Sequence, residues 1–449
     1  MVERLLSAYG RPVPRYTSYP TAPHFHAGID ANRAAEWLSA GPADMPASVY
    51  LHVPYCSKLC WYCGCNTKIV ARAEPVAAFA ELLQREIALV SAWLPQRQKV
   101  THVHWGGGTP NILSPVDFCT ITAELRTHFA VAPDAEIAVE VDPRTLSTDM
   151  MAAFRAAGVT RVSLGVQDFD EKVQQAVNRV QSFATVKQAV LGLRGCGVQS
   201  INLDLMYGLP HQTPETIIAT VDQAASLDPE RIALFGYAHV PWMKKHQRLI
   251  DESALPDDQA RFELATVAVE RLQSRGYEWI GLDHFARPDD PLTRAARSGR
   301  LRRNFQGYTT DATEVLLGLG PSAIGTLPQG YVQNATEPGA WADAIRAGRL
   351  ATVKGIAINA DDRLRRAVIE RLMCDLAVDL DRVARGFGAT ASTFAAEKSA
   401  LAPFVRDGLV ELDGDHVRLT ALGRPLMRSV AAVFDRHLAA SAARHSRAV

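Results

Sequence analysis

The segment Cys56-Ser57-Lys58-Leu59-Cys60-Trp61-Tyr62-Cys63-Gly64-Cys65 places four cysteines on one short stretch of chain. An apolar run at residues 49–53 ends in Pro54 just before it, which indicates a strand that opens into a loop. Thiolates on so short a loop can converge on one metal centre. Because sulfur is a soft ligand, the loop is predicted to hold zinc or an iron–sulfur cluster.

The spacing of these cysteines favours a cluster, with zinc as the alternative. A structural zinc site takes four ligands, usually as two separated pairs, and no second Cys or His pair follows at that distance. A [4Fe–4S] cube normally takes four Cys ligands, so three from one loop would leave one iron open for another molecule. The remaining cysteines are scattered and are predicted to be small core residues: Cys119, Cys196 and Cys374.

The composition describes a folded, electrically neutral chain. Its 449 residues are 47% hydrophobic and 21% charged, enough to bury a large core. With 48 basic and 48 acidic residues the formal net charge is +0, which argues against nucleic acid or an anionic membrane as a partner. We find neither a signal-peptide pattern nor an apolar run of ~20 residues. Seven cysteines, four of them crowded, do not fit a secreted disulfide framework, so we expect a cytoplasmic protein. A monomer is the default expectation for its oligomeric state.

From about residue 47, β-branched apolar runs alternate with amphipathic stretches, the pattern of βαβ units in a parallel sheet. The expected strands are 49–53, 100–105, 136–141, 161–166, 201–206 and 231–237. The expected helices are 75–93, 114–129, 149–157, 183–195 and 214–227. Polar or glycine-rich residues follow several strands, so a site is expected at the carboxyl edge of the sheet. The segments 279–282 and 316–325 should complete or flank that sheet.

The two ends of the chain differ from this pattern. Residues 14–26 combine prolines with aromatic residues, so we expect an extended arm that packs on the folded body rather than a disordered leader. Helices are expected at 361–374 and at 390–401, the second stopped by Pro403. An Asp-Gly hairpin within 407–420 and a last helix at 425–438 make this part similar to a winged helix. Zero net charge and the lack of a base-reading motif disfavour DNA binding, so a small closing domain is expected.

Several polar residues at the strand ends are candidates for chemistry, each with a structural alternative. Three glycines, Gly106–Gly108, let a ligand approach the backbone, although a plain tight turn would explain them too. Asp204 lies within an apolar strand, where a carboxylate is either a buried structural acid or, with Glu140 and Gln167, a group that binds ribose hydroxyls. Arg179 could pair with a ligand carboxylate or form a surface salt bridge.

Four more residues lie further along the chain. His239 could carry a proton, but a lone histidine is more often a hydrogen-bonded core residue. His284 and the basic pair Arg302 and Arg303 could meet an anionic substrate, because the arginine fork binds carboxylates with two hydrogen bonds. A solvated loop is the alternative for this pair.

The pattern Cys-x3-Cys-x2-Cys, with an aromatic residue before the third cysteine, resembles the signature of the radical SAM enzymes. In that family three thiolates hold three irons of a [4Fe–4S] cluster, and S-adenosylmethionine (SAM) chelates the fourth. Six βα units fit the family's open (β/α)6 partial TIM-like barrel. We therefore expect an N-terminal arm at residues 1–44, a catalytic barrel at 45–350 and a small, mainly helical C-terminal domain at 351–449.

Longer stretches resemble one branch closely, the oxygen-independent coproporphyrinogen III oxidases (dehydrogenases) of haem biosynthesis. They are residues 14–22, 50–65, 104–110, 140–143, 165–169, 207–210, 283–290 and 304–309. Thr109 stands where many radical SAM enzymes carry Glu, but Gly-Gly-Gly-Thr-Pro is the form found in this branch. The resemblance implies that the metal ligands are Cys56, Cys60 and Cys63. The SAM contacts that it implies are Tyr50, Tyr62, Gly107, Gly108, Thr109, Glu140, Gln167, Arg179, Asp204, Ala238 and Ile324.

The resemblance also implies the reaction. A SAM-derived 5′-deoxyadenosyl radical would start the oxidative decarboxylation of two propionates of coproporphyrinogen III to vinyl groups, giving protoporphyrinogen IX. The family places a second SAM in the pocket, with Glu140 between the two. Glu140 and Cys65 are the catalytic candidates, although Cys65 could be a thiol behind the ligands or simply packed. A low-potential donor such as flavodoxin or ferredoxin would supply the electron.

Three other functions stay open. Haem chaperones share the radical SAM core, but they typically carry Phe at the place of Cys65 and generally lack the arm at residues 14–22. Another radical SAM enzyme acting on a tetrapyrrole is also compatible with the motifs. An electron-transfer iron–sulfur protein would need a fourth Cys within reach of the cube, and it would not need a large barrel.

Overall fold

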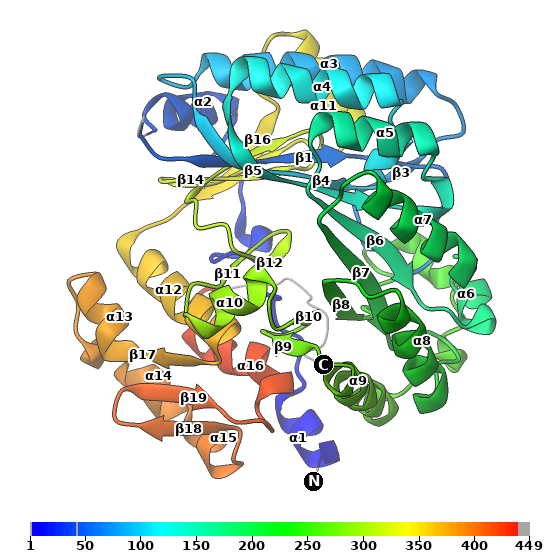
Figure 1. Ribbon diagram of the computed structural model, residues 1–449. Helices are drawn as coiled ribbons and strands as arrows, with labels where there is room; N and C mark the ends of the chain where they lie inside the picture. The colour runs from blue at the N-terminus through cyan, green and yellow to red at the C-terminus, as the bar shows by residue number, and fades with distance from the viewer. Residues whose placement is uncertain (1, 42–43, 439–449) are drawn as a thin grey trace.

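The computed structural model describes residues 2–41 and 44–438, and within them a twelve-stranded sheet forms the body of the fold (Figure 1). Its central strands are parallel to their neighbours and follow the order β13, β1, β4, β5, β6, β7, β8. Their bounds, in the same order, are Val315–Leu319, Ala47–Val53, Lys99–Gly107, Ala130–Val141, Arg161–Gln167, Ser200–Tyr207 and Arg231–Gly236. The six strands expected from sequence are all present, and the (β/α)6 core is confirmed.

Antiparallel strands extend the sheet at both ends. Beyond β13 lie β14 (Ile324–Leu327), β15 (Gly330–Asn334) and β16 (Thr352–Ala357), and beyond β8 lie β10 (His284–Ala286) and β9 (Glu278–Ile280). The segments expected to flank the sheet therefore do so. Two small ribbons stand apart from it: β2 (Tyr55–Cys56) with β3 (Lys68–Ile69), and β11 (Arg302–Asn304) with β12 (Gly307–Thr309).

Helices cover the outer face of the parallel strands, as Figure 1 shows along the upper and right sides. They are α3 (Glu74–Ala92), α4 (Pro115–His128), α5 (Thr148–Ala157), α6 (Glu171–Ala176), α7 (Phe183–Gly195), α8 (Pro214–Ser226), α9 (Asp258–Ser274) and α11 (Pro338–Arg346), whereas α10 (Pro291–Arg297) lies apart from this layer and contacts β9. Several begin at a hydroxyl cap; the Ser147 side chain, for example, accepts from the Met150 amide. No helix among the described residues is long and apolar enough to cross a membrane.

The alternation of side chains along the parallel strands separates the core from an inner lumen. Outward residues such as Trp105, Val139 and Leu203 are buried under the helices. The alternate positions, such as His104 on β4 and Glu140 on β5, line an inner cavity of about 250 Å³. The outer face of the parallel strands is thus apolar, and the polar residues expected at the site lie on the inner face, toward the lumen.

The N-terminal segment is packed, but it is not simply extended. It contains α1 (Val2–Tyr9) and α2 (Ala31–Ser39), which the sequence pattern did not predict because each is short. Between them, the aromatic residues are buried: Tyr16 is 4% exposed and Tyr19 is 2% exposed, in a cluster with the C-terminal residues. Ordered packing of this stretch was the expected outcome.

The C-terminal part is mainly helical and carries a three-stranded sheet. Its helices are α12 (Ala360–Asp375), α13 (Leu380–Gly386), α14 (Ala395–Ala400), α15 (Ala402–Arg406) and α16 (Met427–Ala431). The expected hairpin is β18 (Val410–Asp413) and β19 (His416–Leu419), to which β17 (Ala377–Asp379) adds a strand that was not predicted. The helix predicted to stop before Pro403 ends at Ala400 as α14, and Pro403 then lies in the first turn of a new helix, α15, where a proline costs no hydrogen bond. The predicted helix at 425–438 is shorter, and residues 439–449 lie outside the described part. The divisions at residues 44 and 350 stay predictions.

Candidate active site

The cysteine loop leaves β1 through β2 at the carboxyl edge of the sheet. Its base is closed by two backbone hydrogen bonds, from Lys68 N to Pro54 O at 2.7 Å and from Val70 N to Cys56 O at 3.0 Å. The loop is thus held at both ends by ladder bonds, which fixes the three expected ligands over the strand ends.

Each of the three expected ligand sulfurs accepts a hydrogen bond from the protein. The hydroxyls of Thr67 and Thr109 donate to Cys56 Sγ at 3.2 and 3.3 Å. The guanidinium of Arg179 donates to Cys60 Sγ at 3.3 Å, and the backbone amide of Cys65 donates to Cys63 Sγ at 3.4 Å. Such donors stabilise thiolates, and hydrogen bonds to sulfur also set the reduction potential of an iron–sulfur cluster.

This donor set fits a cluster on the loop. Among the described residues no group of three His, Cys, Asp or Glu side chains is arranged to hold a single metal ion. A cube does not need that convergence, because each of its irons takes its own thiolate. Cys65 N already donates to Cys63 Sγ, so this fourth cysteine contributes to the loop at least through its backbone.

A second segment, residues 239–250, holds the loop from the opposite side. Lys244 Nζ donates to Cys65 O at 2.8 Å, and a ring nitrogen of His246 lies 2.8 Å from Cys63 O. The fully buried amide of Gln247 donates to Tyr62 O at 2.9 Å and to Ala238 O at 3.2 Å. Sequence reasoning missed these residues, because nothing in their local pattern links them to a loop about 180 positions away.

The glycine turn lies between the cysteine loop and Glu140. Gly107 has a left-handed φ of 106°, and its amide lies 3.3 Å from Glu140 Oε2. The Gly108 amide donates to Val53 O at 2.7 Å, and a side chain at Gly108 would place Cβ only 2.5 Å from Tyr55 O. Glycine is therefore required here by close backbone packing, and that packing aims Thr109 at Cys56.

Glu140 is the centre of a polar group inside the lumen. Its Oε1 lies 3.1 Å from His104 Nε2, and the His104 ring stacks on Tyr50 at 5.9 Å. The Tyr50 hydroxyl lies 3.0 Å from His52 Nδ1. Burial acts to raise the pKa of Glu140, but hydrogen bonds from His104 and Gly107 hold that pKa below its ordinary value. The carboxylate is thus charged at neutral pH and can bind an ammonium or a hydroxyl group.

Asp204 faces the same lumen from β7. It accepts from Ser163 Oγ at 2.9 Å and from Asn202 Nδ2 at 2.7 Å. Burial and the charge of Glu140 raise its pKa to about 7. Asn202 Oδ1 is buried without a hydrogen-bond partner among the described residues, so this end of the lumen offers an acceptor for a ligand hydroxyl.

Arg179 is not a surface residue, which rules out its surface salt-bridge alternative. It is 7% exposed, lies beside Cys60 and is 3.6 Å from Asp142 Oδ2. Its Nε is buried without a hydrogen-bond partner among the described residues. Gln167, with a left-handed φ of 72°, ends β6 close to the Gly165 carbonyl to which Arg179 donates. This part of the site can take a ligand carboxylate.

The other expected contacts lie at three places. Gln247 donates to the carbonyls of both Tyr62 and Ala238, and Tyr62 packs against a cluster that contains Val173 and Tyr237. Ile324 begins β14, on the other side of β13 from β1, and packs with Phe25 and Tyr331. His239 lies 2.8 Å from Tyr237 Oη and 2.9 Å from Glu252 Oε1.

The two arginines of the basic pair differ, because Arg303 is buried within the fold and Arg302 is exposed. The Arg303 side chain is 4% exposed, lies 3.7 Å from Asp283 Oδ1 and stacks over Tyr308 at 4.4 Å. Arg302 donates to Glu370 at 2.9 Å. His284 lies 2.8 Å from the same Asp283. The solvated-loop alternative is wrong for Arg303, and both arginines already have acidic partners.

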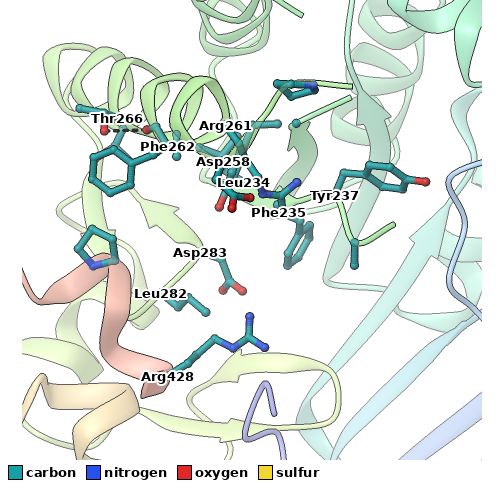
Figure 2. A pocket seen from close by; sticks show the side chains of 18 of the residues that line it. Leu234, Phe235, Tyr237, Asp258, Arg261, Phe262, Thr266, Leu282, Asp283 and Arg428 are labelled. Carbon is teal, nitrogen blue, oxygen red and sulfur yellow. Dashed lines mark hydrogen bonds between the residues drawn. The ribbon is translucent and has the colours of Figure 1, made fainter. Parts of the chain in front are cut away.

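A larger cavity of about 680 Å³ opens beside the lumen (Figure 2). Its walls come from the ends of β7 and β8, from α9, from the N-terminal segment and from the chain around α16. Phe235 borders both this cavity and the lumen. The described site therefore combines a thiol loop, a small polar lumen and a large, mainly apolar chamber.

Comparison with known proteins identifies this combination. The chain matches the family model of the radical SAM superfamily over residues 50–224 and that of the HemN C-terminal domain over residues 358–426. Oxygen-independent coproporphyrinogen III oxidases are similar along the whole chain. The protein of that name from Bradyrhizobium diazoefficiens is 53% identical over 446 residues, with 99% of both chains covered. That from Pseudomonas aeruginosa is 41% identical, with 97% of this chain and 95% of the relative covered.

A solved structure agrees with these relatives. Coproporphyrinogen III oxidase (HemN) from Escherichia coli, described as a radical SAM enzyme, superposes with a TM-score of 0.91 at 38% sequence identity. The match covers 94% of this chain and 98% of that chain, so one solved enzyme shares this fold over nearly its whole length.

Proposed function

The chain belongs to the radical SAM superfamily and, within it, to the oxygen-independent coproporphyrinogen III oxidases, and we propose that it forms protoporphyrinogen IX in haem biosynthesis. Two propionates of coproporphyrinogen III would each lose CO2, two electrons and two protons to become vinyl groups. The observation that carries this proposal is the loop of three thiols, each bonded by a protein donor, above the polar lumen.

The family implies a [4Fe–4S] cluster and SAM, and the residues present fit both. We assign the cluster to Cys56, Cys60 and Cys63. When bound, the cluster and SAM supply a 5′-deoxyadenosyl radical that removes a hydrogen atom from the substrate. The protein's own contribution is to donate hydrogen bonds to the ligand sulfurs from Thr67, Thr109 and Arg179.

The lumen residues would orient SAM. Glu140 stays ionised and suits an ammonium group, whereas Asn202 and Asp204 suit ribose hydroxyls. Arg179, buried and with a free Nε, suits a carboxylate. We further propose a second SAM in the same pocket, with Glu140 between the two. Cys65 would then lie beside the ligands rather than act as one of them.

Three further properties belong to this proposal. A low-potential flavodoxin or ferredoxin would donate the electron, because the cluster must be reduced before each turnover. The enzyme would act as a monomer in the cytoplasm, where the thiols stay reduced. Enclosure of the site by the N-terminal segment and the C-terminal part would keep water away from the reactive intermediate.

The test is an anaerobic assay of the reconstituted protein with SAM, a reductant and coproporphyrinogen III. We expect 5′-deoxyadenosine and protoporphyrinogen IX from the wild type and neither product from Cys56→Ser. Cys119→Ser, on the helix α4, is the matched control and should keep full activity. SAM cleavage without decarboxylation would indicate a different tetrapyrrole substrate. Neither product, together with tight haem binding, would contradict the proposal and favour a haem chaperone.

A further inference from the structure

The large cavity carries three arginines that come from three separate parts of the chain. Arg15 belongs to the N-terminal segment, Arg261 to α9 and Arg428 to α16, and all three line the cavity. In Figure 2 Arg261 and Arg428 reach toward the cavity from opposite walls. The rest of the lining is mainly apolar and includes Phe235 and Phe262. The cavity thus combines a mainly apolar lining with three arginine side chains.

The strand ends are shaped to hold Arg261. A side chain at Gly208 would place Cβ 2.5 Å from Arg261 Nη1, and one at Gly236 would place it 2.7 Å from Arg261 Nη2. The guanidinium also lies over the ring of Tyr207, with 5.3 Å between Cζ and the ring centroid. Two glycines at adjacent strand ends therefore leave the space that this guanidinium fills.

The other two arginines are held by the backbone of the N-terminal segment and of β8. Arg428 is 5% exposed and donates through Nε to Pro14 O at 3.0 Å, and also to Val13 O. Arg15, which follows Pro14 in the chain, is exposed and donates to Gly236 O at 3.4 Å. Carbonyl oxygens thus orient both guanidiniums at the edge of a cavity whose remaining lining is mainly apolar.

The three cations also repel one another. Burial lowers the pKa of both Arg261 and Arg428, the latter to about 9, and the charge of Arg15 lowers each further. The cavity also has acidic residues, Asp258, Glu270 and Asp283, of which Asp283 is engaged by His284 and Arg303. An anionic ligand that bridged the arginines would relieve the repulsion between them.

We propose that Arg15, Arg261 and Arg428 bind propionate carboxylates of the tetrapyrrole, whose macrocycle fills the apolar part of this cavity. The inference rests on the proposed function and names the substrate-binding residues for it. A volume of about 680 Å³ is within the range of pockets that enclose ligands of this size. Because Phe235 lines both the cavity and the lumen, propionates held by the arginines leave another propionate free to point toward Glu140.

The experiment measures binding and catalysis separately in Arg261→Gln and Arg15→Gln. Binding is titrated anaerobically through the fluorescence of coproporphyrin III, a tetracarboxylate that is not turned over, and catalysis is measured with coproporphyrinogen III. We expect the Kd and KM to rise ~10-fold or more in Arg261→Gln, and by a smaller factor in exposed Arg15→Gln, with SAM affinity unchanged. Arg261→Lys should recover part of the loss, because it keeps the charge.

The control is Arg346→Gln on α11, an exposed arginine paired with Asp343, which should leave both constants unchanged. Arg428 is not the primary target, because its substitution would also release Val13 and Pro14. Wild-type Kd and KM in both Arg15→Gln and Arg261→Gln would overturn the inference even if the wild type makes protoporphyrinogen IX. Arginine-dependent binding by a wild type that forms no vinyl product would instead support the binding site and contradict the oxidase function.

Discussion

His104 and Glu140 face each other across neighbouring parallel strands, with 3.1 Å between Nε2 of the imidazole and Oε1 of the carboxylate. The histidine lies on β4 and the glutamate near the end of β5, so the contact joins the glycine turn to the lumen. It also holds the Glu140 carboxylate in the ionised form that a cationic ligand requires.

Glu140→Gln should weaken SAM binding ~10-fold or more, because the amide keeps the shape of the side chain but loses its charge. Isothermal titration of the reconstituted protein with SAM under anaerobic conditions measures this directly. Glu124→Gln on the surface of α4 is the control and should bind SAM like the wild type. Unchanged affinity in Glu140→Gln would show that this carboxylate does not contact SAM.

Gly108→Ala should destabilise the protein by about 1–3 kcal/mol and lower its iron content after reconstitution. The new Cβ would lie 2.5 Å from Tyr55 O and 2.8 Å from Thr67 Oγ1, so the cysteine loop must shift. Thermal unfolding and iron analysis provide the measurements. Gly339→Ala in α11, where a new Cβ has no atom within 4 Å, is the control and should be neutral or stabilising. Equal iron content in both variants would contradict the role of Gly108.

Glu86 should make the stability of the protein depend on pH. It is 1% exposed, accepts from Gly320 N at 2.6 Å and from Asn334 Nδ2 at 2.8 Å, and burial raises its pKa to about 7. Since the unfolded pKa is about 4.3, the folded state binds more protons between these values. The free energy of unfolding should therefore fall by up to about 3 kcal/mol as pH rises from 4.5 to 7.5.

Glu86→Gln removes this proton uptake and keeps an oxygen acceptor for one of the two donors. Urea unfolding at pH 5, 6, 7 and 8 should show a flatter dependence in the variant than in the wild type. Glu81→Gln, at an exposed position of the same helix, should keep the wild-type slope. If the free energy of unfolding of Glu86→Gln depends on pH as steeply as that of the wild type, another group causes the pH dependence.

Tyr16→Phe should loosen the N-terminal segment. The buried Tyr16 hydroxyl donates to Asp435 Oδ2 at 3.0 Å, so its removal should lower the free energy of unfolding by about 1–2 kcal/mol. Limited proteolysis should then cut the first residues of the chain faster. Tyr9→Phe, which loses a hydroxyl bond to Asp407 at a partly exposed position, should have a smaller effect. Equal protection in the Tyr16→Phe variant and the wild type would contradict this role.

The barrel could be predicted because its parallel strands are buried on one face by helices and use apolar, β-branched residues there. Val162 and Leu164 on β6 show this pattern, and so do Ile201 and Leu203 on β7. The helices α1 and α2 could not be predicted in the same way. They are eight and nine residues long, and their stability depends on tertiary packing, as with Leu5 in the C-terminal cluster.

The site was predictable to the extent that its residues follow strands. Cys56, Gly107, Glu140 and Asp204 lie at or near strand ends, and the fold brings them to one edge of the sheet. Gln247 and Arg261 come from segments without a motif, and only the topology of the chain places them beside the loop and the cavity. The sequence indicated Arg303 as a candidate ligand for an anionic substrate. Its acidic partner in the fold, Asp283, lies twenty positions earlier, and no local pattern links the two residues.

The bonds from Arg428 to Val13 and Pro14, and from Tyr16 to Asp435, join the two ends of the described chain around the cavity. During translation the barrel strands emerge long before residue 428 does, so the chamber cannot be completed until residue 428 has been synthesised. A nascent or prematurely terminated chain would therefore have a cysteine loop but no enclosed chamber. Closure of the reaction space is in this way tied to synthesis of the C-terminal part of the fold.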